Sequence, residues 1–451
     1  MRTHRLSRSF AISVAALLFT ACINGTPNSS GNSAVNKDTP AVQVPSADNS
    51  SQPAANGPMS NVAPTNPSPV VNVYLETSGS MNGYVNGGTS IFQQVVKEYL
   101  SGINNAGFAS AVNYYYVNNQ ITPRGNDLAQ YITNLRPSSF ASHGSGATTD
   151  IGAIFKSILG RMDNNTISIF ISDCIISPGR GVDTEAYARG QMTDVRDAVV
   201  KYINDFGDLA CMVYQFDSGF KGNYFDYENT RHAVDMQRPF YIWVFGHTFH
   251  LHNLKLVHVP DRDFRVAPIR NQWMVFNTPL SELQDDNRYG VLLPTGVNNG
   301  KYSRKGGTVV SNIQRFNDSY RFSFGANMQK AQLLMGDDFI EDTDNYVHIV
   351  NKATKEKFYG VIEKDYASKS PFTEIFRVDS PNPFQRGKFT LAFIPSIPKW
   401  AVECTDRDDR SFDGSNNNKT YGLENIFLGI FSGYNSGAHD NILAQFDFEI
   451  K

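Results

Sequence analysis

Cysteine is scarce in this chain, which has four in 451 residues. Cys22 lies near the N-terminus, and the other three are Cys174, Cys211 and Cys404. An odd number beyond Cys22 argues against a framework of disulfide bonds. Cys174 and Cys211 also fall at opposite ends of two expected strands, where a bridge could not form. We therefore expect three free thiols.

An excess of positive charge is also missing. The chain has 40 Lys and Arg against 43 Asp and Glu, a net charge of −3. Nucleic-acid binding is therefore not predicted, because it needs a basic surface. Beyond the first 22 residues no apolar run is long enough to cross a bilayer.

Motifs for covalent catalysis and for phosphate binding are absent as well. Ser80 is preceded two residues earlier by Ser78, where a nucleophile elbow needs glycine. The chain contains no Gly-x-x-x-x-Gly-Lys phosphate loop. No catalytic residue is predicted, and the sequence does not indicate an enzyme.

The first 22 residues have the pattern of an export signal. Arg2, Arg5 and Arg8 precede the apolar stretch 10–19, and Thr20-Ala21-Cys22 closes it. This ending resembles the lipobox of bacterial lipoproteins, which implies that Cys22 carries lipid chains such as palmitate. We expect a lipid-anchored protein of the cell envelope, in the outer membrane, with the face it occupies left open.

Residues 23–69 are mostly Asn, Ser, Pro, Ala and Gly, and their only charged residues are Lys37, Asp38 and Asp48. Such a segment buries too little apolar surface to fold. We expect a disordered tether between the lipid and the folded part.

Apolar strands and amphipathic helices alternate over residues 70–261. This pattern predicts an α/β domain with a doubly wound, mostly parallel sheet, of the Rossmann-like type. The expected strands are 71–75, 111–117, 167–172, 210–216 and 240–245, and the expected helices are 90–100, 128–135, 151–159 and 193–206.

In residues 262–451 apolar residues recur about every second position, as in strands, and no longer every 3.6 positions, as in helices. Short alternating segments are separated there by Gly, Pro and Asn, which predicts an all-β, sandwich-like domain. The expected strands begin near residues 308, 319, 346, 358, 389 and 442.

Three oxygen-bearing side chains follow the first strand of the α/β part. Glu76, Ser78 and Ser80 alternate, so in an extended segment their side chains point the same way. Asp173 follows the strand 167–172, and Thr148 lies in the loop before the helix 151–159. Ligands of open α/β sheets gather at the carboxyl ends of strands. We expect these residues to converge around a hard cation.

This arrangement resembles the von Willebrand factor type A domain and its metal-ion-dependent adhesion site. Glu76, Ser78 and Ser80 occupy the three positions of the family's Asp-x-Ser-x-Ser motif. Asp173 occupies the position of the family's Asp at the end of a later strand. Thr148 matches the loop threonine, with Thr149 as the alternative. Glu76 is a departure, because the family has Asp there.

The resemblance implies Mg²⁺ at this site, with Ca²⁺ or Mn²⁺ as alternatives. It also implies a protein ligand that offers a carboxylate to the ion, or a polysaccharide in its place. Two other functions stay open. One is a structural subunit of an envelope assembly with a vestigial site, and the other is a metal-dependent hydrolase.

Two further groups of polar residues do not match metal sites. His247, His250 and His252 lack the spacing and the partners of a zinc site. The segment 406–414 resembles a calcium loop that begins at Asp409, but Thr420 stands where a bidentate Glu is required.

A long connection is expected at residues 217–238, which are rich in aromatic residues. We expect it either to border the site or to pack against the second domain.

Overall fold

The computed structural model describes residues 67–87, 90–140, 150–176, 178, 181–226, 228, 230–257, 264–294, 300–357, 361–364, 371–411, 417–436 and 441–451. The expected export signal, its Cys22 and most of the expected tether therefore lie outside the described residues.

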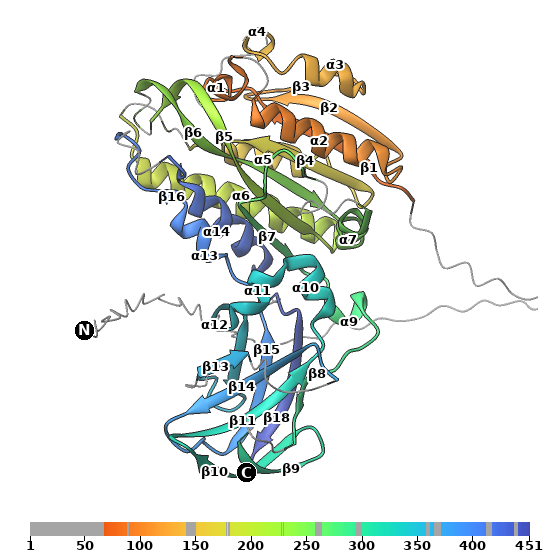
Figure 1. Cartoon of the computed structure of the whole chain (residues 1–451), viewed down its shortest axis with the longest axis vertical. Helices are drawn as coiled ribbons and strands as arrows, with labels where there is room; N and C mark the ends of the chain where they lie inside the picture. The colour runs from red at the N-terminus through yellow and green to blue at the C-terminus, as the bar shows by residue number, and fades with distance from the viewer. Residues whose placement is uncertain are drawn as a thin grey trace, which may run out of the picture. The chain divides into compact units, whose positions relative to one another are not determined.

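Seven strands form the first sheet, and its centre is parallel (Figure 1). β1 lies between β2 and β4 and runs parallel to both, whereas β3, β5, β6 and β7 pair only in antiparallel fashion. The order is β3-β2-β1-β4-β6-β5-β7. The strands are β1 (Val70–Glu76), β2 (Ala111–Val117), β3 (Ile121–Pro123), β4 (Thr166–Ser172), β5 (Ala210–Phe225), β6 (Arg231–Gly246) and β7 (Asn271–Phe276).

Helices cover both faces of this sheet, as expected for an α/β fold. Val73 of β1 points into a core shared with α2, and its neighbour Tyr74 points into a core shared with α5 and α6. These opposite directions follow from the two-residue period of a strand. The helices of this part are α1 (Asn82–Val85), α2 (Ile91–Asn105), α3 (Leu128–Thr133), α4 (Pro137–Phe140), α5 (Ile151–Leu159), α6 (Thr184–Phe206) and α7 (Thr248–Val257).

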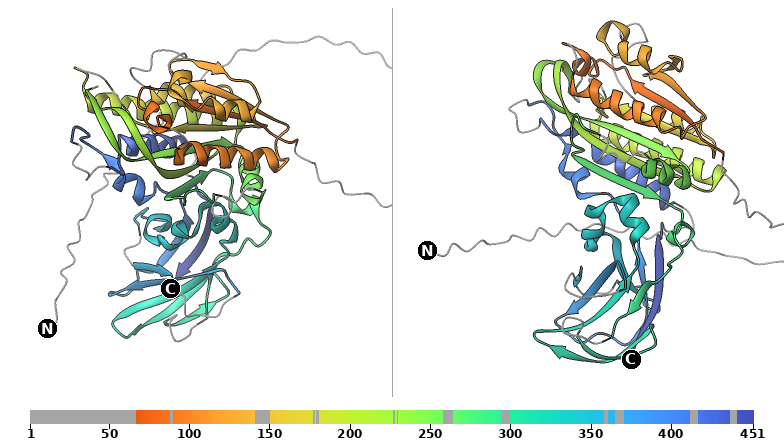
Figure 2. Two further views of the ribbon diagram at one scale, coloured as in Figure 1. Left: turned by 45° about the horizontal axis from the view of Figure 1, so that its top comes forward. Right: turned by 45° about the vertical axis from the view of Figure 1, so that its right-hand side comes forward.

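The sheet differs from the expected mostly parallel one beyond β4. The apolar residues 240–245 belong to β6, which runs antiparallel to β4. The expected connection 217–238 is instead largely the outer part of a hairpin, because β5 and β6 pair continuously from Ala210 and Gly246 to Phe225 and Arg231. Both views of Figure 2 show the outer end of this hairpin beside α1, which it contacts.

The second sheet is mostly antiparallel, and among its described residues one parallel pair joins β10 to β18. Rings of β11 and β14 contact rings of β18 and β15, with Phe322 5.8 Å from Phe448 and Phe376 5.7 Å from Phe393 between centroids. The strands are β8 (Tyr289–Leu292), β9 (Lys301–Lys305), β10 (Val309–Phe316), β11 (Ser319–Ala326), β12 (Val347–Asn351), β13 (Val361–Lys364), β14 (Glu374–Ser380), β15 (Gly387–Phe393) and β18 (Ala444–Ile450).

The sequence boundary at 261 and 262 does not separate the two sheets. β7 lies beyond it and is the seventh strand of the first sheet. The helix α14 also lies beyond it and packs along α6. The remaining elements are α9 (Leu280–Leu283), α10 (Gln329–Met335), α11 (Asp337–Glu341), α12 (Thr343–Tyr346), α13 (Lys399–Glu403), β16 (Thr405–Asp406), β17 (Thr420–Tyr421) and α14 (Leu423–Tyr434).

Within the described ranges, no helix has both the length and the apolar character required to span a bilayer.

Candidate metal centre

The ends of two neighbouring parallel strands bring the predicted acids together. β1 and β4 pair in register, with Leu75 opposite Ile171, so Glu76 and Asp173 leave the same edge of the sheet. Both carboxyl groups are buried, with 1% of each residue exposed. Burial of two acids at one edge is costly unless something compensates their charge.

The two serines of the motif lie in the loop that follows β1. The Oγ atoms of Ser78 and Ser80 are 3.0 Å apart and share a hydrogen bond. Both residues are buried, and Ser80 is the more exposed at 8%. This separation places two hydroxyl oxygens side by side, as oxygen ligands of one cation must be.

The turn after β4 is held by a residue that the sequence did not single out. Ser172 donates from its hydroxyl group to Glu76 Oε2 and accepts from the Cys174 amide at 2.7 Å. Cys174 has φ of 57°, and Trp243 Nε1 donates to its Sγ at 3.2 Å. Left-handed backbone at a buried non-glycine residue is uncommon and gathers at functional turns.

The carboxyl group of Asp173 is only partly satisfied. Its Oδ1 accepts a long hydrogen bond of 3.4 Å from the Ile175 amide. Its Oδ2 is buried and has no hydrogen-bond partner among the described residues. Burial and the charge of Glu76 raise the pKa of Asp173 to about 7. Hydrogen bonding to Ser80 and to the Ile175 amide and the charge of Arg238 oppose this rise more weakly.

Arg238 of β6 is a buried cation near this pair, and 3% of it is exposed. Its guanidinium carbon lies 4.6 Å from the centroid of the Tyr224 ring. Of the groups that act on the pKa of Asp173, Arg238 has the smallest effect. Arg238 therefore compensates the two acids only in part.

The structure thus brings together four of the five predicted ligands, Glu76, Ser78, Ser80 and Asp173, at one edge of the first sheet. Thr148 and its alternative Thr149 lie outside the described residues. Sequence reasoning missed Ser172 and Arg238. The signal for Arg238 was a lone basic residue directly before the apolar run 239–245, and a serine at the end of a strand gives no comparable signal.

The oxygen donors of this edge fit a small divalent cation. Carboxylate and hydroxyl oxygens are the ligands that Mg²⁺ and Ca²⁺ take, and no sulfur or nitrogen ligand is required. Among the described residues, no group lies in hydrogen-bond geometry to the buried Oδ2 of Asp173, which is therefore an electron-pair donor available to a cation. A cation held by Glu76, Ser78, Ser80 and Asp173 would satisfy this atom and offset the repulsion between the two acids.

The histidines and the calcium-like segment have structural partners. His247 Nδ1 lies 3.1 Å from Asp208 Oδ2, and His252 Nε2 lies 2.9 Å from Lys330 Nζ. Asp409 Oδ2 accepts a 2.5 Å hydrogen bond from the Tyr224 hydroxyl group. In the part of the chain that the structure describes, no three His, Cys, Asp or Glu side chains gather as a metal site. The candidate centre has only two such residues and relies on hydroxyl groups.

The chain matches no protein-family model, no curated protein and no solved structure.

Proposed function

We propose that this protein binds a ligand through a divalent cation held at the edge of the first sheet by Glu76, Ser78, Ser80 and Asp173. The observation that carries the proposal is the buried Oδ2 atom of Asp173, which has no hydrogen-bond partner among the described residues and lies beside a second buried acid. The hydroxyl oxygens of Ser78 and Ser80, 3.0 Å apart, are the other two proposed ligands among the described residues.

The expected ion is Mg²⁺. Few protein oxygens are available here, and Mg²⁺ keeps several waters and binds through one or two carboxylates, whereas Ca²⁺ takes six to eight oxygens. Mn²⁺ shares the preference of Mg²⁺ for oxygen and is the first alternative. When bound, the ion supplies positive charge that attracts an anionic group of a partner.

The proposed ligand is a protein that presents a carboxylate, with a polysaccharide as the alternative. The motif residues and the adjacent parallel strands β1 and β4 support a likeness to the von Willebrand type A domain. The antiparallel β6 beside β4 departs from the parallel arrangement that the sequence led us to expect. We further propose that the chain is an envelope lipoprotein anchored through Cys22, on the evidence of its first 22 residues.

Isothermal titration of the full chain with Mg²⁺ tests the cation site. The wild type should bind with a measurable heat, and Asp173→Asn should lose it, because the amide removes the negative charge at nearly the same size. Asp318→Asn is the matched control, since Asp318 is exposed in the turn between β10 and β11. Equal heats for the wild type and Asp173→Asn would overturn the proposal.

One observation favours a second function, a structural subunit with an inactive site. All four described candidate ligands are buried, and one carboxylate oxygen of Glu76 already accepts from Ser172. If the wild type gives no heat with Mg²⁺, Mn²⁺ or Ca²⁺, this structural role becomes the better interpretation.

A further inference from the structure

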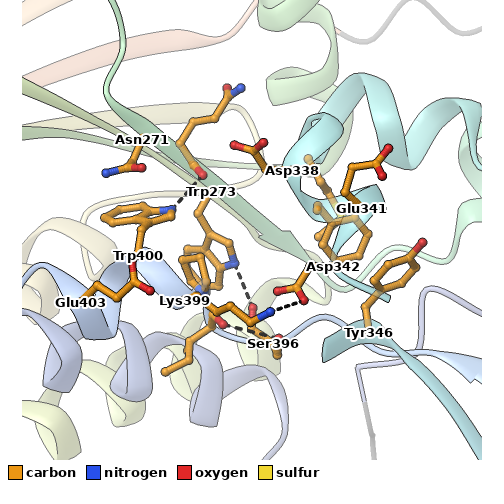
Figure 3. A pocket seen from close by; sticks show the side chains of 15 residues that line it. Asn271, Trp273, Asp338, Glu341, Asp342, Tyr346, Ser396, Lys399, Trp400 and Glu403 are labelled. Atoms are coloured by element: carbon orange, nitrogen blue, oxygen red, sulfur yellow. Dashed lines mark hydrogen bonds and ion pairs between the residues drawn. The ribbon is translucent and has the colours of Figure 1, made fainter. Parts of the chain in front are cut away.

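A cavity of about 470 Å³ lies well away in sequence from the metal-centre motif. β7, α11, α13 and the segment before α13 contribute side chains to it (Figure 3). Two of the chain's three tryptophans, Trp273 and Trp400, line it. Its size is in the range of small-molecule sites, which combine aromatic walls with a few placed polar groups.

The aromatic walls are held in place by their own hydrogen bonds. Trp273 Nε1 donates to the Ser396 carbonyl at 3.0 Å, and Trp400 Nε1 donates to the Gln272 carbonyl at 3.2 Å. Both indole rings also pack on Phe427, at 5.1 Å and 5.0 Å between centroids. The indole N–H groups thus need no polar partner from a ligand. Trp273 is 4% exposed, so the ring surface open to a ligand belongs mainly to the half-buried Trp400.

The charges around the cavity are unbalanced. Among the described residues that line it are four carboxylates and one basic residue, Lys399. Asp342 pairs with Lys399 at 2.6 Å, and Glu341 pairs with Lys364 at 2.6 Å. Asp338 and Glu403 make no ion pair among the described residues. Figure 3 shows Trp400 and Glu403 on one side of the cavity and Asp338 on the other.

We propose that this cavity binds an organic cation, namely an ammonium or guanidinium group carried on an apolar stem. An aromatic face attracts such a group through its quadrupole. The carboxylates of Asp338 and Glu403, which have no ion-pair partner among the described residues, supply the two negative charges, and apolar surface of Trp400 contacts the stem. Free amines and the Lys or Arg side chains of a partner protein share this chemistry.

Tryptophan fluorescence of the full chain reports on binding, because Trp400 and Trp273 line the cavity. Trp400 is half-buried and is the main reporter, whereas Trp273 is 4% exposed and Trp243 is fully buried. The probes are N-acetylarginine methylamide, N-acetyllysine methylamide and tetramethylammonium. N-acetylcitrulline methylamide is the matched neutral probe, since it has nearly the shape of the arginine derivative without its charge. Tighter binding of the amino-acid derivatives points to a protein side chain, and equal binding of tetramethylammonium points to a free amine.

The expected result is saturable binding of the cationic probes and at least fivefold weaker binding of the citrulline probe. Asp338→Asn combined with Glu403→Gln should weaken binding of the arginine probe by fivefold or more, because each exposed charge contributes up to about fivefold. Both residues are exposed, so the double variant should fold normally. Asp318→Asn should bind like the wild type.

Equal affinity for the arginine and citrulline probes would overturn the proposal, and so would an unchanged affinity in the double variant. Absence of any fluorescence change with all cationic probes would do the same. The inference is independent of the metal centre, since Asp173→Asn should leave probe binding unchanged. A neutral saccharide that binds equally to the wild type and the double variant would assign the cavity to sugars instead.

Discussion

Ser172 donates a hydrogen bond to Glu76 Oε2 and so joins the ends of the parallel strands β4 and β1. Both residues are buried, so the bond is shielded from water. The longer side chain of glutamate spans the gap between the strands. This gives a physical reason for glutamate at a position where the von Willebrand type A pattern has aspartate.

Glu76→Asp should therefore destabilise the protein by about 1–3 kcal/mol, because the shorter side chain leaves a buried hydrogen bond unmade. Urea unfolding at constant pH measures the change in free energy. Glu185→Asp is the control, since the Glu185 side chain is 84% exposed and the change there should stay within about 0.5 kcal/mol. Equal effects at both positions would contradict the role of the Ser172 bond.

The raised pKa of Asp173 predicts how stability without a divalent cation depends on pH. Its pKa is about 7 in the folded chain and 3.8 in the unfolded chain, so the folded state binds the proton more tightly. The contribution of Asp173 to the free energy of unfolding should fall as pH rises from about 4 to about 7 and should not change further above that range. A shift of this size corresponds to roughly 4 kcal/mol at most.

Asp173→Asn should remove this contribution, because the amide does not titrate. Unfolding in EDTA from pH 4 to pH 8 measures it as the difference between wild type and variant. Titrating groups remote from Asp173 cancel in this difference, whereas Glu76 interacts with Asp173, so the difference reports on the pair of acids. The variant should become the more stable of the two as pH rises. Parallel profiles would show that Asp173 does not titrate near pH 7.

The loop that carries Ser78 and Ser80 is fixed by close packing just beyond it. A Cβ atom at Gly83 of α1 would lie 2.3 Å from the Phe220 ring of β5. Gly83→Ala should therefore cost about 1–3 kcal/mol of stability and weaken Mg²⁺ binding, since α1 must move. Gly190→Ala in α6 meets nothing within 4 Å and should be neutral or stabilising by up to about 1 kcal/mol. Matching results for both variants in urea unfolding would rule out the packing effect.

Much of the first sheet was predictable, because its apolar pattern is local. β2 and α5 begin and end where the sequence placed them, and β4 differs by one residue. The continuation of β5 beyond Phe216 was missed, because Asp217, Gly219 and Gly222 interrupt the apolar pattern. Residues 217–225 of β5 are held in a strand by backbone pairing with β6, and the local sequence pattern does not predict this pairing.

The only part of the candidate site that the sequence predicted is the part that strand order and direction determine. Parallel neighbours end at the same edge, which is why Glu76 and Asp173 meet. The bond from Ser172 and the approach of Arg238 depend on side-chain packing between distant segments. The periodic pattern of apolar residues in the sequence does not predict such side-chain contacts.

The helix α14 was also missed, because it lies among segments that alternate with period 2. Because α14 packs closely against α6, adding one methyl group at Gly433 of α14 should reduce stability. A Cβ atom at Gly433 would lie 2.5 Å from Val199 Cγ1 and 2.6 Å from Val199 Cβ. The Cβ atom of valine cannot rotate away, so the two helices must separate.

Gly433→Ala should therefore destabilise the protein by about 1–3 kcal/mol, although alanine favours an isolated helix over glycine by up to about 1 kcal/mol. Ser432→Ala is the neighbouring control, at a half-buried position, and should change stability by less than about 0.5 kcal/mol. Urea unfolding followed by far-UV circular dichroism measures both. Because α14 packs on the layer that covers β1 and β4, Gly433→Ala should lower the unfolding midpoint of the first sheet. A separate early transition, with the first sheet unchanged, would show that α14 contributes nothing to it.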